Sequence, residues 1–397
     1  MANKLRVLFL PKWYPNRYDP MPGLFIQRQA EAITPYCDVA VIYVHPDPHC
    51  PNKMEAEFSE ENEVRVLRVY YRTSENPSSL FGKALNLIRF YRAHRKAFHS
   101  IRQFSPEIVH AHILTRMGFV ALRISQQIRV PLVISEHWSR YFPENNTYRG
   151  WLRKLVTVFV TEKASAVVAV SDPLLNAMKK CGLRNSRFRI IPNVVDMTFP
   201  AAPSSETKTS VKTMVHISCF DDRSKNISGF LNSIKALSET RQDFSCLMIG
   251  EGPDLADMKE YAGYLRIPSS LITFSGLKTG PEFAELLSSA DFSVLSSRYE
   301  TFGTVVVESL AGGVPVVATK VGVAMELIND TNGILVPPGD EAAMTRALNT
   351  MLDGCRQYDK SQIVLSTGDK FSRETIGKQL ELLYRELLTP AANPSRS

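Results

Sequence analysis

The sequence predicts an α/β protein with two domains, each a doubly wound, mostly parallel sheet covered by helices on both faces. Three observations lead to this expectation. The chain has 397 residues, which is more than one hydrophobic core of ordinary size accommodates. Short apolar runs of strand length alternate with helical patterns, as is typical of parallel sheets. The alternation stops near residue 200 and begins again near residue 212.

The predicted strands are short runs rich in aliphatic and β-branched residues. In the first half of the chain they cover 6–10, 39–43, 107–111, 130–134 and 166–170. In the second half they cover 214–218, 245–249, 271–274, 292–295, 314–318 and 334–336. Ligands of doubly wound sheets bind at the carboxyl ends of the strands. We therefore expect two such domains that face each other across a cleft, with the functional residues in the loops after the strands.

The domain boundaries follow from breaks in this pattern. We assign 1–200 to the first domain and 212–371 to the second. Residues 201–211 are polar, with three Ser, two Thr and one Pro, and lack periodicity, so they are predicted to be the linker. Residues 372–389 form a helix whose apolar stripe comprises Ile376, Leu380, Leu383 and Leu387. No strand follows this helix, and we expect it to cross back to the first domain.

The composition excludes several classes of protein. Apolar residues make up 44% and charged residues 22%, which is typical of globular domains and not of disordered chains. No apolar run approaches the ~18 residues that a spanning helix needs. No signal peptide is expected, and the six scattered cysteines are interpreted as reduced thiols of a cytoplasmic protein. The net charge of +7 favours an anionic partner.

The segment 296–318 carries the strongest functional signal. It has the pattern of a strand end, a loop, a helix, a Gly-Gly turn and a second strand. Glu300 lies in the loop and Glu308 about two turns into the helix. A helix N-terminus offers unpaired backbone N–H groups to phosphate, and carboxylates accept hydrogen bonds from vicinal hydroxyls. Each glutamate alone is as readily explained as a cap or a solvated side chain, but the combination indicates a phosphorylated, polyhydroxylated ligand.

This arrangement closely resembles the family 4 retaining glycosyltransferases, whose GT-B fold consists of two Rossmann-like domains. Their signature is a Glu, seven residues and a second Glu, followed by a small-residue turn, Pro and a strand. The resemblance implies that Glu300 contacts the transferred sugar and Glu308 the ribose of the nucleotide. It further implies that Phe302, Gly303 and Thr304 cradle the diphosphate.

The loop after the strand 214–218 resembles the same family. Many relatives have a Gly-Arg pair here and a Lys a few residues later, and both cations stabilise the leaving diphosphate. Lys225 keeps the second cation, whereas Cys219 replaces the arginine. The resemblance implies that Lys225 is catalytic. Arg223, the Ser218 hydroxyl and backbone donors remain as candidates to replace the missing phosphate contact.

Glycines mark two further loops. Gly250 and Gly252 form a strand-to-helix turn that borders the nucleotide in the family, although a simple tight turn explains them equally well. Gly23 opens the first helix, where relatives carry glycines near the donor phosphates. All three are assigned to donor binding.

Histidines and aromatic residues mark the first domain. His137 follows the strand near Ile134, and the family has a histidine there that faces the donor sugar, so we assign it to the catalytic group. His110 and His112 have a spacing that suits a metal, but no third ligand is evident, and no metal site is predicted. We assign His112, with Tyr14 and Arg17 from the loop after the first strand, to the acceptor side. Packing of the aromatic residues of this loop on the linker is an equal alternative.

Residues 85–104 form a predicted helix with one basic face. The cations on it are Arg89, Arg92, Arg95, Lys96 and Arg102, with His99. Two interpretations stay open: a solvated face opposite an apolar stripe, or a dock for anionic lipid headgroups. Nucleic acid is not expected as a partner, since no recognisable binding module accompanies the charge.

The predicted activity is therefore retaining, metal-independent transfer of a hexose. The donor is a UDP- or GDP-sugar and the acceptor a sugar or a lipid-linked glycan, in surface polysaccharide or glycoconjugate synthesis. No cofactor is expected. The alternatives are a sugar-nucleotide epimerase of similar fold and a nucleotide-sugar-binding protein that has lost turnover. Nothing in the sequence resembles the pyridoxal phosphate lysine of a phosphorylase.

Overall fold

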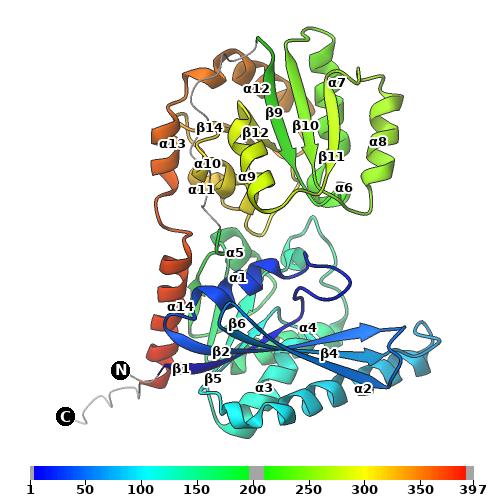
Figure 1. Cartoon of the computed structure of the whole chain (residues 1–397), viewed down its shortest axis with the longest axis vertical. Coiled ribbons are helices and arrows are strands. Elements are labelled where there is room, and N and C mark those ends of the chain that lie inside the picture. The colour runs from blue at the N-terminus through cyan, green and yellow to red at the C-terminus, as the bar shows by residue number, and fades with distance from the viewer. Residues whose placement is uncertain (1–3, 196–209, 390–397) are drawn as a thin grey trace. The chain divides into compact units, whose positions relative to one another are not determined.

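The computed structural model describes residues 4–195 and 210–389, and the chain divides into two compact units (Figure 1). The first unit comprises 1–138, 148–194 and 372–397, and the second comprises 139–147 and 195–371. Most of the linker expected at 201–211 lies outside the described residues.

An eight-stranded sheet forms the centre of the first unit. Its strands stand in the order β3-β4-β2-β1-β5-β6-β7-β8, all parallel except β3, which is antiparallel to β4. The strands are β1 (Leu5–Pro11), β2 (Cys37–Asp47), β3 (Met54–Glu61), β4 (Val64–Arg72), β5 (Ile108–His112), β6 (Leu132–Glu136), β7 (Ala166–Ala169) and β8 (Phe188–Ile190). The five strands predicted for this half are present.

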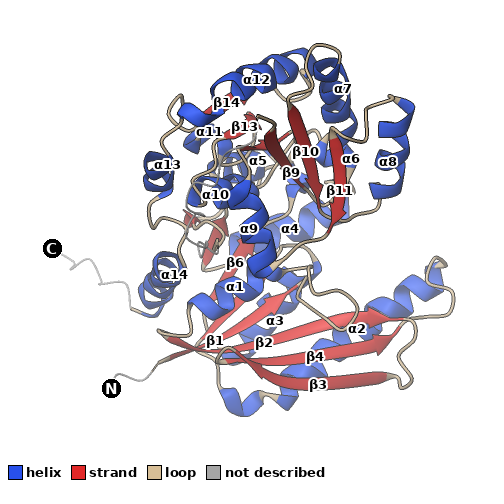
Figure 2. Cartoon of the chain, turned by 45° about the horizontal axis from the view of Figure 1, so that its top comes forward, coloured by secondary structure: helices blue, strands red, loops and turns tan. Residues whose placement is uncertain are grey.

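The helices of the first unit cover both faces of this sheet (Figure 2). They are α1 (Leu24–Ala32), α2 (Leu80–Ser100), the 3-10 turn η1 (Arg102–Phe104), α3 (Arg116–Ile128), α4 (Trp151–Lys163), α5 (Asp172–Lys180) and α14 (Arg373–Leu388). The helix predicted at 85–104 is thus α2 followed by η1. The helix predicted at 372–389 is α14, and the Ser372 hydroxyl caps it by accepting from the Thr375 N–H.

Helix α14 packs against α1 on one face of the first sheet. Its buried residues Ile376, Leu380 and Leu383 join the core cluster that also contains Phe9 of β1. A Cβ at Gly377 would lie 2.1 Å from the Ala32 carbonyl oxygen, so glycine permits the close approach of the two helices. The C-terminal helix is therefore an integral part of the first unit.

A parallel sheet of six strands forms the centre of the second unit, in the order β11-β10-β9-β12-β13-β14. The strands are β9 (Lys212–Ile217), β10 (Phe244–Ile249), β11 (Ile272–Gly276), β12 (Phe292–Leu295), β13 (Val316–Thr319) and β14 (Gly333–Val336). All six strands predicted for this half are present. The order is that of a doubly wound dinucleotide-binding fold.

The helices of the second unit again lie on both faces of its sheet. They are α6 (Asp222–Lys225), α7 (Ile227–Ser238), α8 (Leu255–Tyr264), α9 (Gly280–Ser289), α10 (Thr304–Ala311), α11 (Ala324–Leu327), α12 (Glu341–Gly354) and α13 (Lys360–Thr367), with the 3-10 turns η2 (Ser139–Tyr141) and η3 (Cys355–Gln357). Residues of α7, α8 and α12 share one core cluster, and Leu287 of α9 belongs to another. The fold class predicted from the sequence, two Rossmann-like α/β domains, is confirmed.

Within the described ranges, no helix is both long and apolar enough to cross a membrane.

Candidate active site

The loops after β9 and β12 leave the second sheet at its topological switch point. The two strands are neighbours, but the chain continues from β9 to β10 on one side and from β12 to β13 on the other. Ligands of doubly wound sheets bind beside the carboxyl ends of the strands at such a point. The first loop carries Ser218, Arg223 and Lys225, and the second carries Glu300. Segments that the sequence predicts to bind the donor are therefore neighbours in the fold.

Lys225 and Glu300 form an ion pair between these two loops. The Lys225 Nζ lies 2.5 Å from Oε1 of Glu300, which also accepts a 2.7 Å hydrogen bond from the Ser297 hydroxyl. Only 19% of the lysine side chain and 12% of the glutamate side chain is exposed. Burial lowers the pKa of Lys225, but Glu300, together with Cys219 and Asp221, raises it by more, so that the pKa is raised overall. Lys225 is therefore a fixed positive charge at neutral pH.

Hydrogen bonds hold the two loops against each other. The Ser296 hydroxyl donates to the Lys225 carbonyl oxygen at 2.8 Å and lies 2.9 Å from Nε2 of His216 on β9. The Arg298 N–H donates to the Ser224 carbonyl oxygen at 2.8 Å. Burial lowers the pKa of His216 to about 3, so its ring is neutral. Since the Ser296 hydroxyl donates its proton to the Lys225 carbonyl oxygen, the N–H of His216 Nε2 is the donor to the Ser296 oxygen.

The start of the loop after β9 offers one unused hydrogen-bonding group. The Ser218 hydroxyl oxygen is buried and has no hydrogen-bond partner among the described residues. Cys219 beside it is exposed. The Arg223 guanidinium donates to the Asn145 carbonyl oxygen, within the second unit. Arg223 would have to leave that partner before it could replace a cation at position 219.

Gly250 and Gly252 allow the loop after β10 to pack against the loop after β9. A Cβ at Gly250 would lie 1.9 Å from the Ser218 carbonyl oxygen, and one at Gly252 would lie 2.2 Å from the Cys219 carbonyl oxygen. Gly250 also has a φ of +134°. This packing alone explains why glycine is required at both positions. The contact of these glycines with a donor stays a prediction.

The start of α10 is suited to an anion. Gly303 precedes it with a φ of +92°, and no side chain caps the helix before Thr304. The Val306 N–H donates to the Gly303 carbonyl oxygen at 3.0 Å, but no side chain caps the first N–H groups, which lie at the positive end of the helix dipole. Glu308 lies in the second turn and is 9% exposed. The Phe302 ring is buried against Phe371, so only the backbone of Phe302 is available to a ligand.

Gly322 supports the loop that carries Glu300, and the sequence analysis missed it. Its φ is +52°, and a Cβ there would lie 2.3 Å from the Phe302 carbonyl oxygen and 3.0 Å from Cβ of Glu300. The neighbouring Val323 N–H donates to the same Phe302 oxygen at 2.8 Å. A glycine soon after a predicted strand was the available signal. His216, Ser296 and Ser297 were also missed, although polar residues within and after buried strands mark them.

In the first unit, three histidines lie side by side near the carboxyl ends of β5 and β6. The His110 and His112 rings stack at 4.2 Å between centroids, and His112 Nδ1 lies 3.4 Å from His137 Nε2. His112 Nε2 and His137 Nδ1 are buried without a hydrogen-bond partner in the described part of the chain. Burial lowers the pKa of His137 to about 3 and that of His112 well below its ordinary value. These rings are neutral hydrogen-bonding groups at physiological pH.

Both ring nitrogens of His110 form hydrogen bonds within the first unit. Its Nδ1 lies 2.7 Å from the Tyr384 hydroxyl of α14, and its Nε2 lies 2.8 Å from the Ser135 hydroxyl of β6. Among residues 4–195 and 210–389, no three or more His, Cys, Asp or Glu side chains are grouped so that they could hold a metal ion.

The segment between β1 and α1 contains both Tyr14 and Gly23. Gly23 precedes α1 with a φ of +74°, and a Cβ there would lie 2.2 Å from the Trp13 carbonyl oxygen. Glycine therefore lets the loop fold back on itself. The Tyr14 ring is completely buried in the core of the first unit. It has no surface to offer an acceptor, which corrects the expectation from the sequence.

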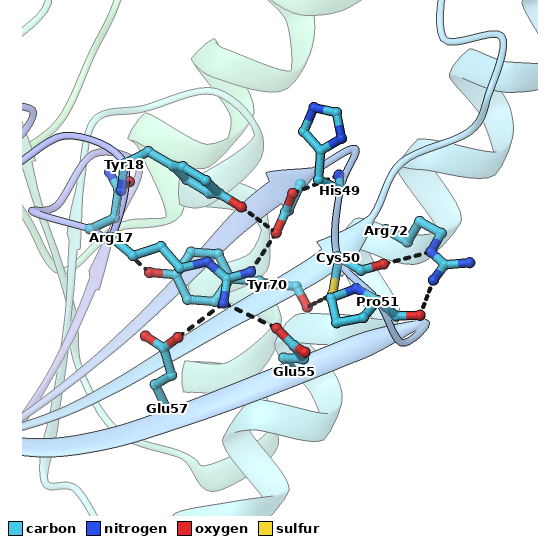
Figure 3. A network of polar contacts seen from close by, with 11 residues as sticks. Arg17, Tyr18, His49, Cys50, Pro51, Glu55, Glu57, Tyr70 and Arg72 are labelled. Carbon is cyan, nitrogen blue, oxygen red and sulfur yellow. Dashed lines mark hydrogen bonds and ion pairs between the residues drawn. The ribbon is translucent and has the colours of Figure 1, made fainter.

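Arg17 lies at the centre of a polar network (Figure 3). It contacts Asp47 at 2.5 Å, Glu55 at 3.0 Å and Glu57 at 3.1 Å, and its guanidinium lies 3.9 Å from the centre of the Tyr70 ring. These residues belong to β2, β3 and β4. Arg17 thus ties the loop after β1 to three strands. Its expected role toward an acceptor stays a prediction.

Two family models match the chain, one for each half. The model described as "Glycosyltransferase Family 4" matches residues 36–199, and the one described as "Glycosyl transferases group 1" matches residues 202–362. The second match contains both loops of the switch point.

Curated relatives are similar over most of their length. A putative teichuronic acid biosynthesis glycosyltransferase, TuaC of Bacillus subtilis, is 24% identical over 386 residues, which is 90% of each chain. The alpha-D-kanosaminyltransferase of Streptomyces kanamyceticus is 26% identical over 301 residues, 70% of this chain and 77% of its own.

Solved structures share the fold. Sucrose-phosphate synthase from Thermosynechococcus elongatus aligns over 97% of this chain and 99% of its own, with a TM-score of 0.77 and 20% identity. HepE of Anabaena, in complex with UDP and glucose, aligns over 96% of this chain and 100% of its own, with a TM-score of 0.70 and 19% identity.

Proposed function

Because this chain belongs to the group 1 glycosyltransferases, enzymes that act on a sugar donor, we propose that it transfers a hexose from a UDP- or GDP-sugar to a sugar or lipid-linked glycan. We further propose that the transfer retains the anomeric configuration and needs neither a metal ion nor a cofactor. The product would be a surface polysaccharide or a glycoconjugate. The ion pair of Lys225 and Glu300 at the switch point is the observation that carries this proposal.

Lys225 has the properties of a leaving-group stabiliser. Its ammonium is preorganised by Glu300, largely shielded from solvent and charged at neutral pH. A positive charge held in a partly desolvated site stabilises developing negative charge much better than one in water does. In the proposed reaction the ammonium pairs with the departing diphosphate. It then supplies the charge that a divalent cation supplies in other transferases.

Glu300 would then bind the sugar. When Lys225 pairs with the diphosphate instead of with Glu300, Oε1 of Glu300 keeps the hydrogen bond from Ser297. It can then accept another from a hexose hydroxyl. The bond between C1 of the hexose and the phosphate oxygen breaks, and the acceptor oxygen bonds to C1 from the same face. The acceptor proton passes to the departing phosphate oxygen, so no protein nucleophile is required.

Two other groups support diphosphate binding at these loops. The buried Ser218 hydroxyl is without a partner among the described residues, and an uncapped helix begins at Thr304. Both can donate to phosphate oxygens. Glu308, four residues into that helix, is proposed to accept from the ribose hydroxyls. In the first unit, the free ring nitrogens of His112 and His137 are proposed to contact sugar hydroxyls.

The relatives support the donor and product classes. The structural neighbour HepE holds UDP and glucose, and TuaC is named for teichuronic acid biosynthesis. Another relative is named alpha-monoglucosyldiacylglycerol synthase, with 24% identity over 257 residues. A nucleotide-sugar donor and a polymer or lipid acceptor are therefore the first choices to test.

A nucleotide screen tests the proposal. A nucleotide present at 100 times its Kd stabilises the protein by about 2.7 kcal/mol, which raises Tm by several degrees. We expect UDP or GDP, and their sugars, to do so, and ADP not to. Release of the diphosphate from the stabilising sugar, with acceptor present and EDTA added, should then proceed. No stabilisation by any nucleotide, or conversion of the donor to its epimer without an acceptor, would overturn the proposal.

Cys219 favours one alternative, a nucleotide-sugar-binding protein without turnover. It stands where many relatives carry a second diphosphate-binding cation, and its exposure leaves room for a longer side chain. If Cys219→Arg raises turnover sharply while donor affinity stays constant, the natural chain is a binding protein. Cys219→Ser, of similar size and without charge, is the matched control. An active wild-type enzyme that Cys219→Arg scarcely changes supports the transferase.

A further inference from the structure

One face of the first unit carries more positive charge than the net charge of the whole protein. The connections through α2, α3 and α4 all step in the same direction along the sheet, β4 to β5, β5 to β6 and β6 to β7. Since such crossovers are right-handed, the three helices cover the same face, on which α5 between β7 and β8 also lies, and α3 contacts α4. We call this the three-helix face. It comprises the segments 80–104, 116–129 and 149–163.

The three-helix face has thirteen lysines and arginines and a single acidic residue, Glu162. The cations are Lys83, Arg89, Arg92, Arg95, Lys96, Arg102, Arg116, Arg123, Arg129, Arg149, Arg153, Lys154 and Lys163. All are exposed except Arg89, which is half-buried. The face therefore has a formal charge of +12, whereas the whole chain has +7, and the rest of the chain is net negative. A surface this asymmetric selects for an anionic partner.

A groove between α2 and α3 concentrates this charge. Its volume is about 610 Å³, and the cations that line it are Arg92, Arg95, Lys96, Arg102 and Arg123. None of its twelve lining residues is acidic. Five guanidinium and ammonium groups around one hollow provide donors for several phosphate groups at once.

Helix α4 on the same face buries small residues, Val160 among them, and leaves its bulkiest apolar side chains exposed. It buries Thr157 and Thr161, whose hydroxyls donate to carbonyl oxygens of their own helix at 2.8 and 2.7 Å. It exposes bulky apolar side chains instead, to 78% at Trp151, 62% at Leu155 and 46% at Phe159. A surface helix of a globular domain is expected to bury such residues. A contiguous exposed apolar stripe marks an interaction site.

The first turn of α2 repeats this feature. Leu80 and Phe81 are 87% and 79% exposed, next to the exposed Lys83. Helices α2 and α4 both follow strands of the parallel sheet, so both begin at its carboxyl edge. Apolar side chains therefore project at this edge of the three-helix face, with cations around and behind them.

We propose that the three-helix face docks on an anionic phospholipid bilayer. The groove between α2 and α3 receives lipid phosphates, while Trp151, Leu155 and Phe159 of α4, with Leu80 and Phe81 of α2, enter the interface. This combination of apolar and cationic side chains on one surface is what an interfacial helix requires. The inference goes beyond the proposed reaction and does not depend on it, because it concerns residues outside the switch-point loops.

Two other partners fit less well. A second copy placed symmetrically on this face would bring two surfaces of formal charge +12 together, which is repulsive. Duplex nucleic acid would use the cations but would leave the apolar stripe of α4 in water. A bilayer with anionic headgroups satisfies both parts of the surface.

Vesicle co-sedimentation with the full chain tests the proposal. We expect binding to phosphatidylcholine vesicles that contain phosphatidylglycerol, and no binding to phosphatidylcholine alone. Arg92→Gln/Arg95→Gln/Lys96→Gln should weaken binding at least ~10-fold and reduce its salt dependence, since each surface cation contributes separately. The matched control is Lys259→Gln/Arg346→Gln, which removes exposed cations of the second unit and should bind as the wild type does.

A second variant tests the apolar part. Trp151→Ser/Leu155→Ser should also weaken binding ~10-fold, because it removes exposed apolar surface that would enter the interface. Tyr264→Ser/Leu365→Ser changes residues of similar exposure in the second unit and should have no effect. In the wild type, Trp151 fluorescence should shift to the blue on vesicle addition, and this shift should vanish in the variant. Unchanged melting temperatures verify that the variants fold.

Three results would overturn the proposal. The first is absence of vesicle binding at low ionic strength, or equal binding to neutral and anionic vesicles. The second is a duplex nucleic acid that binds more tightly than the vesicles and displaces them. The third is a dimer in sedimentation equilibrium that Trp151→Ser/Leu155→Ser dissociates, which would assign the stripe to a second copy of the chain.

Discussion

The Lys225 ammonium lies 2.5 Å from the Glu300 carboxylate, although 75 positions of sequence separate the two residues. The contact exists because β9 and β12 are neighbours in the sheet and the chain leaves them in opposite directions. Each side chain restrains the other, and Ser297 fixes the carboxylate further. A positive charge that is already oriented when a ligand binds needs no reorganisation during the reaction.

Replacing Lys225 with alanine should therefore affect turnover more than folding. We expect kcat to fall ~10²-fold or more, by analogy with the removal of one preorganised charge stabiliser. Single-turnover rates of nucleotide diphosphate release measure the effect. Lys259→Ala, an exposed lysine on α8, is the control and should keep the wild-type rate. A near-normal rate in Lys225→Ala would remove this residue from the mechanism.

The two glutamates should separate binding from turnover. Glu308→Ala should weaken nucleotide binding, because the proposed contact of Glu308 is to the ribose and persists throughout the reaction. Glu300→Ala should mainly lower kcat, because the proposed contact of Glu300 is to the hexose as its bond to phosphate breaks. Calorimetric titration with the free nucleotide, beside kcat and KM for the donor, distinguishes them. Equal loss of nucleotide affinity in both variants would contradict this division of roles.

The sequence predicted most strands with a buried apolar run but missed β3, β4 and β8 of the first unit. Of these, β4 was missed although most of its residues are buried, whereas β3 and β8 depend on their surroundings. The strand β3 is rich in glutamate. Apart from Met54 at its start, its only bulky apolar residue is Phe58, which is 65% exposed. Such an edge strand forms because β4 pairs with it, through a turn at Asn62 and Glu63 that both have positive φ. The short strand β8 likewise has two exposed residues among its three.

The candidate site shows the same division. Lys225 and Glu300 were predicted separately, each from its own motif, but their contact depends on which strands are neighbours. Tyr14 was assigned to the acceptor side because it lies in a loop with other aromatics, yet its ring packs into the core. Loop membership in the sequence does not determine which way a side chain points. Gly322 was missed because the backbone that requires a glycine there, at Phe302, lies 20 residues earlier in the sequence.

The buried histidines should make stability depend on pH. Burial lowers the pKa of His110 to about 3, whereas the unfolded chain titrates near 6.5. Between these values the unfolded state binds more protons, so acid favours unfolding. The stabilisation is complete above pH 6.5 and is lost as the pH falls, by up to about 1.4 kcal/mol per pH unit for each such histidine.

Urea denaturation at pH 7, 6 and 5 measures this slope. His110→Gln should lower stability at pH 7, because the bonds to Tyr384 and Ser135 change, but it should also flatten the slope by up to one proton. An unchanged slope in His110→Gln would show that its ring is protonated in the folded protein.

Gly322 should be essential to the position of Glu300. In Gly322→Ala the new Cβ would lie 2.3 Å from the Phe302 carbonyl oxygen and 3.0 Å from Cβ of Glu300, at a φ of +52°. The backbone must shift, and the displaced loop carries the carboxylate that holds Lys225. We expect a loss of about 1–3 kcal/mol in the free energy of unfolding, the range for strained backbone positions. We also expect a fall in kcat of ~10-fold or more, since small misplacement of a reacting group is costly.

The matched control is Gly263→Ala near the end of α8. No atom lies within 4 Å of its added Cβ, so alanine should be neutral there or stabilise the helix by about 0.5–1 kcal/mol. Chemical denaturation and donor turnover of both variants, measured together, separate loop displacement from a general effect of alanine. If Gly322→Ala unfolds at the wild-type denaturant concentration and turns over normally, the loop with Glu300 does not depend on the close packing of Gly322.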